Sequence, residues 1–254
     1  DSVQSMLSDV AEKERLAREL ELAREIQESL LPARYLEFGP VGVQATFQPA
    51  TEVGGDYFDV FPISEDRLVV TIGDVAGHGL STGLLMASLK SSVAALVYEG
   101  YGGTDLIEKV NHLLMEHGQM GTMATMAVAE IELGEGSLVL ANAGHCPALL
   151  IHPDGRLEEL LAGSPPMGSR LCSPTSLVRQ FPVGSRLILY SDGLVEAISP
   201  DGEPFGYQRL AEVVEAATDL SVSGLTATML NALAEHSVGV PAADDLTVLI
   251  LECN

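Results

Sequence analysis

The chain has 254 residues, 36 of them acidic and 13 basic, with a formal net charge of −23. Nucleic acids and anionic membrane surfaces attract clustered Lys and Arg, so neither is an expected partner. We expect a cytoplasmic protein without membrane insertion. Its three cysteines form no zinc or disulfide pattern, and no apolar run approaches the ~18 residues of a membrane span.

Residues 1–34 are expected to form a helical linker. They lack Gly, have no Pro before Pro32, and are rich in Glu, Arg, Leu and Ala, which predicts a helix that ends at Pro32. Apolar or small residues recur at steps of three and four. Two interpretations stay open: a helix lying on the globular body, or a coiled coil that makes a homodimer through residues 1–33. Because the chain begins with Asp1, we expect an excised piece of a longer protein or a deliberately trimmed chain, with the helix connecting it to something upstream.

Residues 35–254 are expected to form one compact domain. Predicted strands come in runs and predicted helices in pairs, an order typical of antiparallel sheets flanked by helices rather than of repeated βαβ units. In chain order the predicted elements are strands at 41–47 and 67–73, helices at 80–98 and 104–116, strands at 123–133, 137–142, 148–152 and 156–160, a loop at 162–176, a strand at 186–191, helices at 207–217 and 223–237, and a last strand at 246–252.

Several aspartates stand beside apolar runs, where an unpaired carboxylate is costly to bury. No Lys or Arg lies within three residues of any of them. Converging carboxylates are matched best by a hard divalent cation, so the pattern predicts a shared metal site at strand ends. For any single one, a turn-forming role is the alternative. These aspartates are Asp56, Asp74, Asp192, Asp244 and Asp245.

Five motifs then point to a family. They are Gly54–Asp59, Gly73–Gly79, Asn142–His145, Tyr190–Gly193 and Asp244–Thr247, in this order. Together they resemble the SpoIIE/RsbU-type phosphatases, the bacterial branch of the metal-dependent protein phosphatase (PPM) family, over roughly residues 35–252. The resemblance implies an α+β fold, a four-layer αββα sandwich of two antiparallel sheets flanked by helices, and a phosphatase domain spanning 35–254.

The resemblance also implies two Mn²⁺ or Mg²⁺ ions between the sheets. Asp74 would bridge both ions. Asp56 and the backbone carbonyl of Val75 would hold one ion, and Asp192 and Asp244 would hold the other. The four aspartates would thus be both the catalytic residues and, with Val75, the metal ligands.

Four further residues have open roles. Asp59 and Asp245 are candidates for supporting the ligands, or are plain surface acids. His78 is expected to anchor the start of the following helix rather than to act as a general acid. His145 lies in a glycine-flanked turn, where a structural hydrogen bond is favoured over proton transfer.

The resemblance implies a protein phosphatase that hydrolyses phosphoserine or phosphothreonine with a metal-activated water. Its expected substrate is a phosphorylated anti-sigma-factor antagonist, as in bacterial partner switching and stress signalling, and its expected regulator is the N-terminal helix. Two alternatives remain. One is a catalytically silent phosphoprotein-binding module of the same fold, which the full acidic set disfavours. The other is a structural Ca²⁺ protein, which the missing EF-hand loop disfavours.

Overall fold

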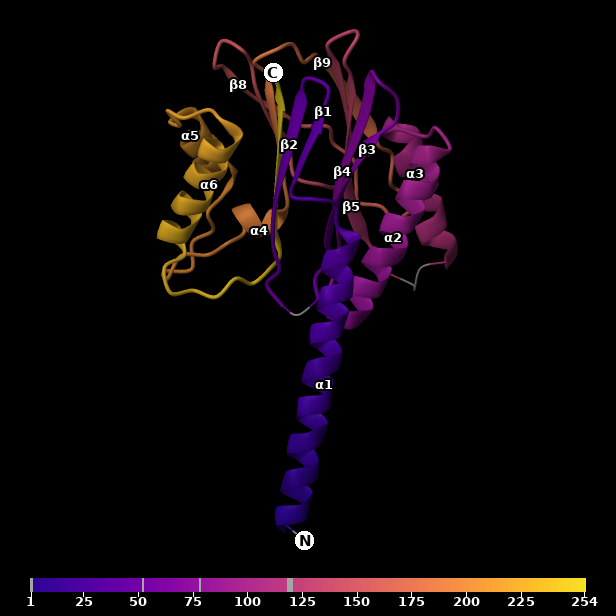
Figure 1. Ribbon diagram of the computed structural model, residues 1–254, viewed down its shortest axis with the longest axis vertical. Coiled ribbons are helices and arrows are strands. Elements are labelled where there is room, and N and C mark those ends of the chain that lie inside the picture. Colours follow the sequence, from indigo (N-terminus) through magenta and orange to yellow (C-terminus); the bar gives the residue numbers. More distant parts are fainter. Residues whose placement is uncertain (1, 52, 78, 118–120) are drawn as a thin grey trace.

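Two antiparallel sheets lie face to face, and helices cover the outer face of each (Figure 1). The predicted four-layer αββα sandwich of class α+β is therefore confirmed. The computed structural model describes residues 2–51, 53–77, 79–117 and 121–254, with only the backbone described for residues 2–9, 11 and 117.

The first sheet has six strands in the order β1-β2-β11-β10-β7-β8. Its central strands are buried on both faces, which explains why they read as nearly continuous apolar runs. The bounds are β1 (Tyr35–Phe38), β2 (Val41–Gln48), β7 (Ala148–Ile151), β8 (Leu157–Leu160), β10 (Arg186–Tyr190) and β11 (Leu246–Cys253).

The second sheet has five strands in the order β3-β4-β5-β6-β9. The bounds are β3 (Asp56–Pro62), β4 (Arg67–Val75), β5 (Ala124–Glu132), β6 (Ser137–Ala143) and β9 (Thr175–Gln180). Side chains such as Phe58, Ile72 and Leu249 fill the space between the two sheets. That space is the main core, and the candidate site lies along one edge of it.

Helices α2 (Leu80–Tyr98) and α3 (Gly103–His117) cover the second sheet, whereas α5 (Tyr207–Glu215) and α6 (Val222–His236) cover the first (Figure 1). A short helix, α4 (Asp192–Val195), follows β10 directly. Among the described helices, α2 alone is long and apolar enough to span a membrane. Its inner face packs against β3 and β4, and core helices share this composition.

Strands β1, β3 and β9 were not predicted. β1 has only four residues, and β9 is an edge strand with mostly exposed side chains whose first residues fall in the predicted loop at 162–176. β3 was hidden because its first three residues are all buried, so its apolar pattern does not alternate. β4 also continues past the predicted end at residue 73 and includes Asp74.

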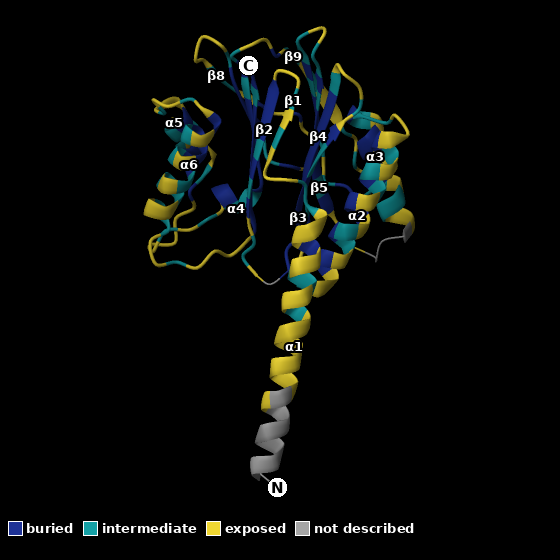
Figure 2. Cartoon of the chain, in the orientation of Figure 1, coloured by how far each residue is buried: buried dark blue, intermediate teal, exposed yellow. Residues whose placement is uncertain are grey.

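Helix α1 (Ser2–Leu30) confirms the predicted linker helix, which ends just before Pro32. It projects away from the two sheets, and most of its described side chains face solvent (Figure 2). Leu22 and Ile26 are 57% and 55% exposed. The interpretation of a helix lying on the body is therefore wrong for this segment. Only the last turns reach the body, where Gln27 is buried.

Asp59 forms an ion pair with Lys90, which fastens β3 to α2. Both side chains are nearly buried, at 13% and 11% exposure. Lys90→Met would leave a buried carboxylate without its partner, so we expect the free energy of unfolding to fall by about 3–5 kcal/mol. Urea unfolding measures this, with the exposed Lys13→Met as the control. A loss no larger than that of the control would contradict a stabilising role for the pair.

Candidate metal centre

Asp56 and Asp74 face each other on neighbouring strands. They are directly opposite partners in the antiparallel pair of β3 and β4, so their side chains leave the sheet on the same face, with Cβ atoms about 5 Å apart. That face looks into the space between the sheets, because the Thr247 hydroxyl of β11 donates to Asp56 Oδ2 at 2.5 Å. The core thus ends at this edge in two buried or half-buried carboxylates.

The other sheet brings Asp192 and Asp244 to the same edge. Asp192 opens α4 at the end of β10, and Asp244 lies just before β11. The two segments pack tightly, since a Cβ on Gly193 would come within 2.0 Å of the Asp245 carbonyl oxygen. The Ser191 hydroxyl adds a hydrogen bond to that carbonyl at 3.2 Å and accepts one from the Thr247 N–H at 2.9 Å. The spacing of the two aspartates is therefore fixed by backbone contacts.

Asp245 is a structural clip for the glycine loop before β3. Its carboxylate accepts hydrogen bonds from the N–H groups of Ala50 at 2.9 Å and Gly55 at 2.8 Å, with a longer contact to Asp56 N. It is buried, and a Cβ on Gly54 would overlap one of its oxygens. Asp245 thus supports Asp56 through the backbone, whereas the more exposed Asp244 accepts one hydrogen bond, from the Asp245 N–H at 2.8 Å.

The Val75 carbonyl stands next to Asp74 in a small cradle. A Cβ added to Gly55 would lie 2.5 Å from both Asp74 Oδ1 and the Val75 carbonyl oxygen. Both oxygens therefore crowd the same side of Gly55, where no side chain would fit. Carboxylate and carbonyl oxygens are also the donors that Mg²⁺ and Mn²⁺ prefer. The residues present fit the implied metal.

The carboxylates also show the electrostatic strain of such a cluster. Burial, and then the neighbouring aspartate charges, raise the pKa of Asp74 to about 7. Burial raises the pKa of Asp56 well above its usual range, although the Thr247 and Ser191 hydroxyls oppose the shift. The pKa values of Asp192 and Asp244 are raised as well, in both cases first by burial. A bound cation would relieve all four shifts.

Within the described residues, no group of three or more His, Cys, Asp or Glu side chains is arranged so that it could hold a metal ion without further ligands. Water and backbone oxygens complete many Mg²⁺ and Mn²⁺ sites, and here the Val75 carbonyl is in place. The same charge repulsion that raises the pKa values opposes closer approach of the carboxylates.

His145 serves the fold of the site. Its Nδ1 lies 2.8 Å from the Thr125 hydroxyl, and that hydroxyl accepts a hydrogen bond from the Asp74 N–H at 3.2 Å. Asn142 closes the turn, because its side chain bonds the His145 N–H and carbonyl. Burial lowers the pKa of His145 to about 4, so the neutral ring is a structural partner near neutral pH. His78 lies outside the described residues.

Four supporting residues were missed by sequence reasoning. The Thr247 hydroxyl bonds the Asp56 carboxylate, and the Ser191 hydroxyl bonds the Asp245 carbonyl. The Thr125 hydroxyl accepts from the Asp74 N–H, and Gln27 reaches the glycine loop from α1. One signal was available: Asp245 has the same strand parity as Thr247, Leu249 and Leu251, all of which face the core between the sheets. That alternation separates the inward Asp245 from Asp244.

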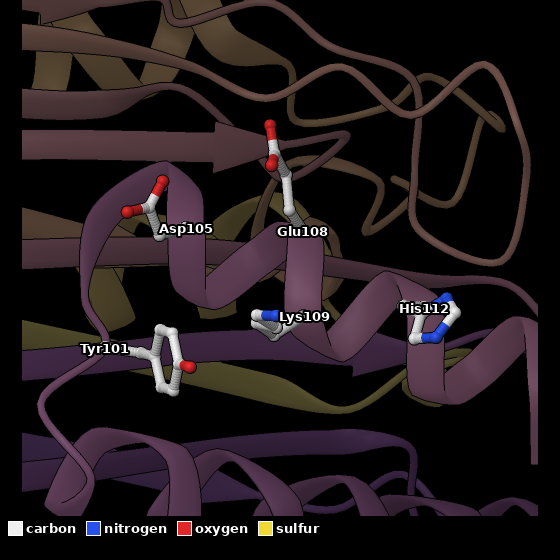
Figure 3. Close-up of a pocket in the computed structure, with 5 residues that line it drawn as sticks. All are labelled: Tyr101, Asp105, Glu108, Lys109 and His112. Carbon is white, nitrogen blue, oxygen red and sulfur yellow. The ribbon is translucent and has the colours of Figure 1, made fainter.

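A second hollow lies away from this cluster. It measures about 420 Å³, and its lining side chains are spread along the outer side of α3 and the turn before it (Figure 3). The residues are Tyr101, Asp105, Glu108, Lys109 and His112. None of them belongs to the acidic cluster, so this hollow is not part of the candidate site.

The raised pKa of Asp74 predicts an unusual pH dependence for the metal-free protein. Between pH ~4, where an unfolded Asp titrates, and pH ~7, the folded state holds a proton that the unfolded chain has lost. The free energy of unfolding should therefore fall as pH rises through this window, by on the order of 3 kcal/mol. Asp74→Asn should flatten the slope in urea unfolding with EDTA. Equal slopes in both proteins would contradict this.

Together, these features place an acidic cluster and a neighbouring backbone carbonyl at one edge of an αββα sandwich. The profile of the family described as Stage II sporulation protein E (SpoIIE) matches residues 64–254. This match covers well over half of the chain. The chain belongs to the SpoIIE family.

Relatives and solved structures agree with this assignment. Protein IcfG of Synechocystis is 28% identical over 93% of this chain and 42% of its own length. The phosphoserine phosphatase RsbP of Bacillus subtilis is 26% identical over 92% of this chain and 58% of its own length. The chain thus spans about half the length of these relatives. The SiaA-PP2C domain of Pseudomonas aeruginosa superposes with a TM-score of 0.84 at 17% identity, over 96% of this chain and 99% of that domain.

Proposed function

We propose that this chain is a metal-dependent protein phosphatase acting on phosphoserine or phosphothreonine. The observation that carries the proposal is the convergence of Asp56, Asp74, Asp192 and Asp244, contributed by both sheets, at one edge beside the Val75 carbonyl. Membership of the SpoIIE family supports it, as does a solved relative of the same fold, RsbX, in complex with magnesium (TM-score 0.66, 18% identity, over 87% of this chain and 98% of RsbX).

The ligand assignment follows the two sides of the site. Asp56 and the Val75 carbonyl belong to the β3–β4 side and would hold one ion. Asp192 and Asp244 belong to the β10–β11 side and would hold the other. Asp74 carries charge coupling to both Asp192 and Asp244, which suits it to bridge the two ions. When bound, divalent cations activate water near neutral pH and neutralise phosphoryl oxygens.

The protein's own residues position the candidate ligands, and they leave no proton-transfer role for His145. Asp245 fixes the loop that carries Asp56, and Thr247 orients the Asp56 carboxylate. His145 is neutral and occupied by Thr125, so no proton transfer is assigned to it. Residues 48–53, just before the first acidic motif, contain no arginine that could hold a phosphate. Phosphate recognition would then rest on cations and backbone N–H groups.

The finer parts of the proposal concern substrate and setting. We propose a phosphorylated anti-sigma-factor antagonist as the substrate, an upstream sensor in the full-length protein, and a cytoplasmic location. The curated relative RsbU of Bacillus subtilis, named a phosphoserine phosphatase, supports the substrate class (23% identity over 75% of this chain and 57% of RsbU). The acidic surface, with a net charge of −23, disfavours nucleic-acid partners.

Mn²⁺-dependent release of phosphate from a phosphoserine peptide tests the proposal. We expect activity that EDTA abolishes and that added Mn²⁺ restores. Binding of the phosphopeptide without turnover would favour the catalytically silent module. Retention of a tightly bound Ca²⁺ with neither binding nor turnover would favour the structural metal protein.

We propose that regulation runs through α1, which would pair with a second copy as a homodimeric coiled coil formed by residues 1–33. Gln27 clamps the glycine loop with both ends of its amide: Nε2 donates to the Gly54 carbonyl at 2.7 Å, and Oε1 accepts from the Gly54 N–H at 3.0 Å. The next residue is Gly55, which forms the cradle with Asp74. A shift of α1 would therefore reach the site through one loop.

Gln27→Ala should uncouple the linker from the site. The substitution leaves two buried backbone groups of Gly54 unpaired, at a cost of about 1–3 kcal/mol each, so the loop is expected to move and Mn²⁺-dependent activity to fall about tenfold. Glu25→Ala, on the exposed side of the same helix, is the control. Equal activity in the two variants, together with unchanged activity after deletion of residues 1–33, would rule the relay out.

A further inference from the structure

A groove of about 690 Å³ opens beside the acidic cluster. It lies between α4, the end of α6 and the segment that leads into β11, which Figure 1 shows in yellow passing beneath α4. The groove is lined by Asp244, which is one of the candidate ligands, and by Gly193, which follows the candidate ligand Asp192. A chain whose phosphorylated residue sits at the metal centre can therefore continue directly into the groove.

The walls of the groove are largely apolar. Leu230 and Leu233 of α6 form part of one wall, and Ile198 and Val238 stand at its rim. These rim side chains are 42% and 64% exposed. Large apolar side chains that stay exposed around a concave surface are typical of a binding site.

The main chain of the same segment offers free hydrogen-bonding groups. Between residues 239 and 243, the Val240 N–H bonds the Ser237 carbonyl at 3.0 Å, but within the described structure the N–H groups of Gly239, Ala242 and Ala243 donate no hydrogen bond. The Ser237 hydroxyl is buried in the groove wall without a partner. An extended peptide can pair with the free N–H groups while it places a side chain between the apolar walls.

The charge of the groove indicates which peptide side chains it can bind. Its only charged lining residues are Glu196 and Asp244, both acidic, and no described lining residue is basic. Acidic side chains next to the phosphorylated residue would therefore be repelled, and aliphatic or basic ones are favoured.

We propose that this groove binds the substrate segment next to the phosphorylated residue and holds one aliphatic side chain against Ile198 and Val238. This inference rests on the proposed phosphatase function and names its specificity site. The groove would sort phosphoproteins by the residues that flank the phosphate, while the metal centre acts on the phosphate alone.

The test compares two kinds of substrate on the whole chain with Mn²⁺. One is para-nitrophenyl phosphate, which has no flanking residues, and the other is a pair of phosphoserine peptides with either Leu or Ser at the flanking positions. We expect the Leu peptide to be preferred about tenfold in kcat/KM, the value of burying one aliphatic side chain. Val238→Asp should abolish that preference through KM and leave para-nitrophenyl phosphate hydrolysis unchanged.

A matched control and a charge swap separate recognition from damage. Val183 is equally exposed, at 67%, but lies in the turn between β9 and β10, so Val183→Asp should keep the Leu preference. For a peptide with Lys at the flanking position, kcat/KM should rise in the Val238→Asp variant. If Val238→Asp keeps the Leu preference, the groove proposal is wrong. It is also wrong if the substitution changes only the sedimentation of the protein, because the groove would then be a contact between two copies of the chain. If neither substrate is hydrolysed, the phosphatase function itself fails, and the groove proposal with it.

Discussion

Asp74→Asn is expected to lower Mn²⁺-dependent phosphatase activity by at least about a hundredfold, and Asp192→Asn to do the same. Removing an oxygen ligand or a group that stabilises developing charge typically costs this much. Asp74 has the stronger claim, because its oxygen lies in the Gly55 cradle and its pKa responds to both sides of the site. Phosphate release from a phosphoserine peptide measures the effect.

The control for these variants is Asp201→Asn, because Asp201 is exposed in the turn before Phe205. Thermal melting in EDTA checks the fold, and Asp74→Asn should melt no lower than the wild type near pH 7.5, since it removes a carboxylate that is costly to bury in the charged form. Wild-type activity in both site variants would remove the enzyme interpretation.

Gly55→Ala should abolish tight Mn²⁺ binding while the protein stays folded. The new Cβ would lie only 2.5 Å from Asp74 Oδ1 and from the Val75 carbonyl oxygen, so both oxygens would have to move. Gly55 does not have a positive φ angle, so the effect comes from this overlap and not from backbone strain. We expect a loss of about a hundredfold in Mn²⁺ affinity by calorimetric titration.

Gly163→Ala is the matched control. Gly163 also lacks a positive φ angle, and a Cβ there meets nothing within 4 Å. It should bind Mn²⁺ like the wild type. If Gly55→Ala binds Mn²⁺ as tightly as Gly163→Ala, Asp74 Oδ1 and the Val75 carbonyl oxygen do not hold the ion.

The fold was predictable from sequence where the hydrophobic pattern was strong. Helices such as Leu80–Tyr98 and buried strands such as Leu246–Cys253 are long and uniform, and their predicted positions are close to those observed. β3 was missed because the packing of both sheet faces removes its alternation. The layer arrangement came from family resemblance, since pairing between distant strands such as β2 and β11 leaves no local signal.

The candidate site was predictable in its acids and unpredictable in its supports. Burial cost alone singled out the aspartates, because no positive charge lies near them in sequence. The Gln27 clamp on Gly54 joins segments 27 residues apart, and the Asp245 bond to Gly55 spans 190. Such contacts depend on tertiary packing. The ion pair between Asp59 and Lys90 could be identified only in the structure, for the same reason.

A crystal of the protein soaked in Mn²⁺ and measured at the manganese absorption edge tests the central claim most directly. The account predicts two anomalous peaks per chain between the sheets, one beside Asp56 and the Val75 carbonyl and one beside Asp192 and Asp244, with Asp74 contacting both. Anomalous peaks elsewhere on the acidic surface, with none among these residues, would contradict it.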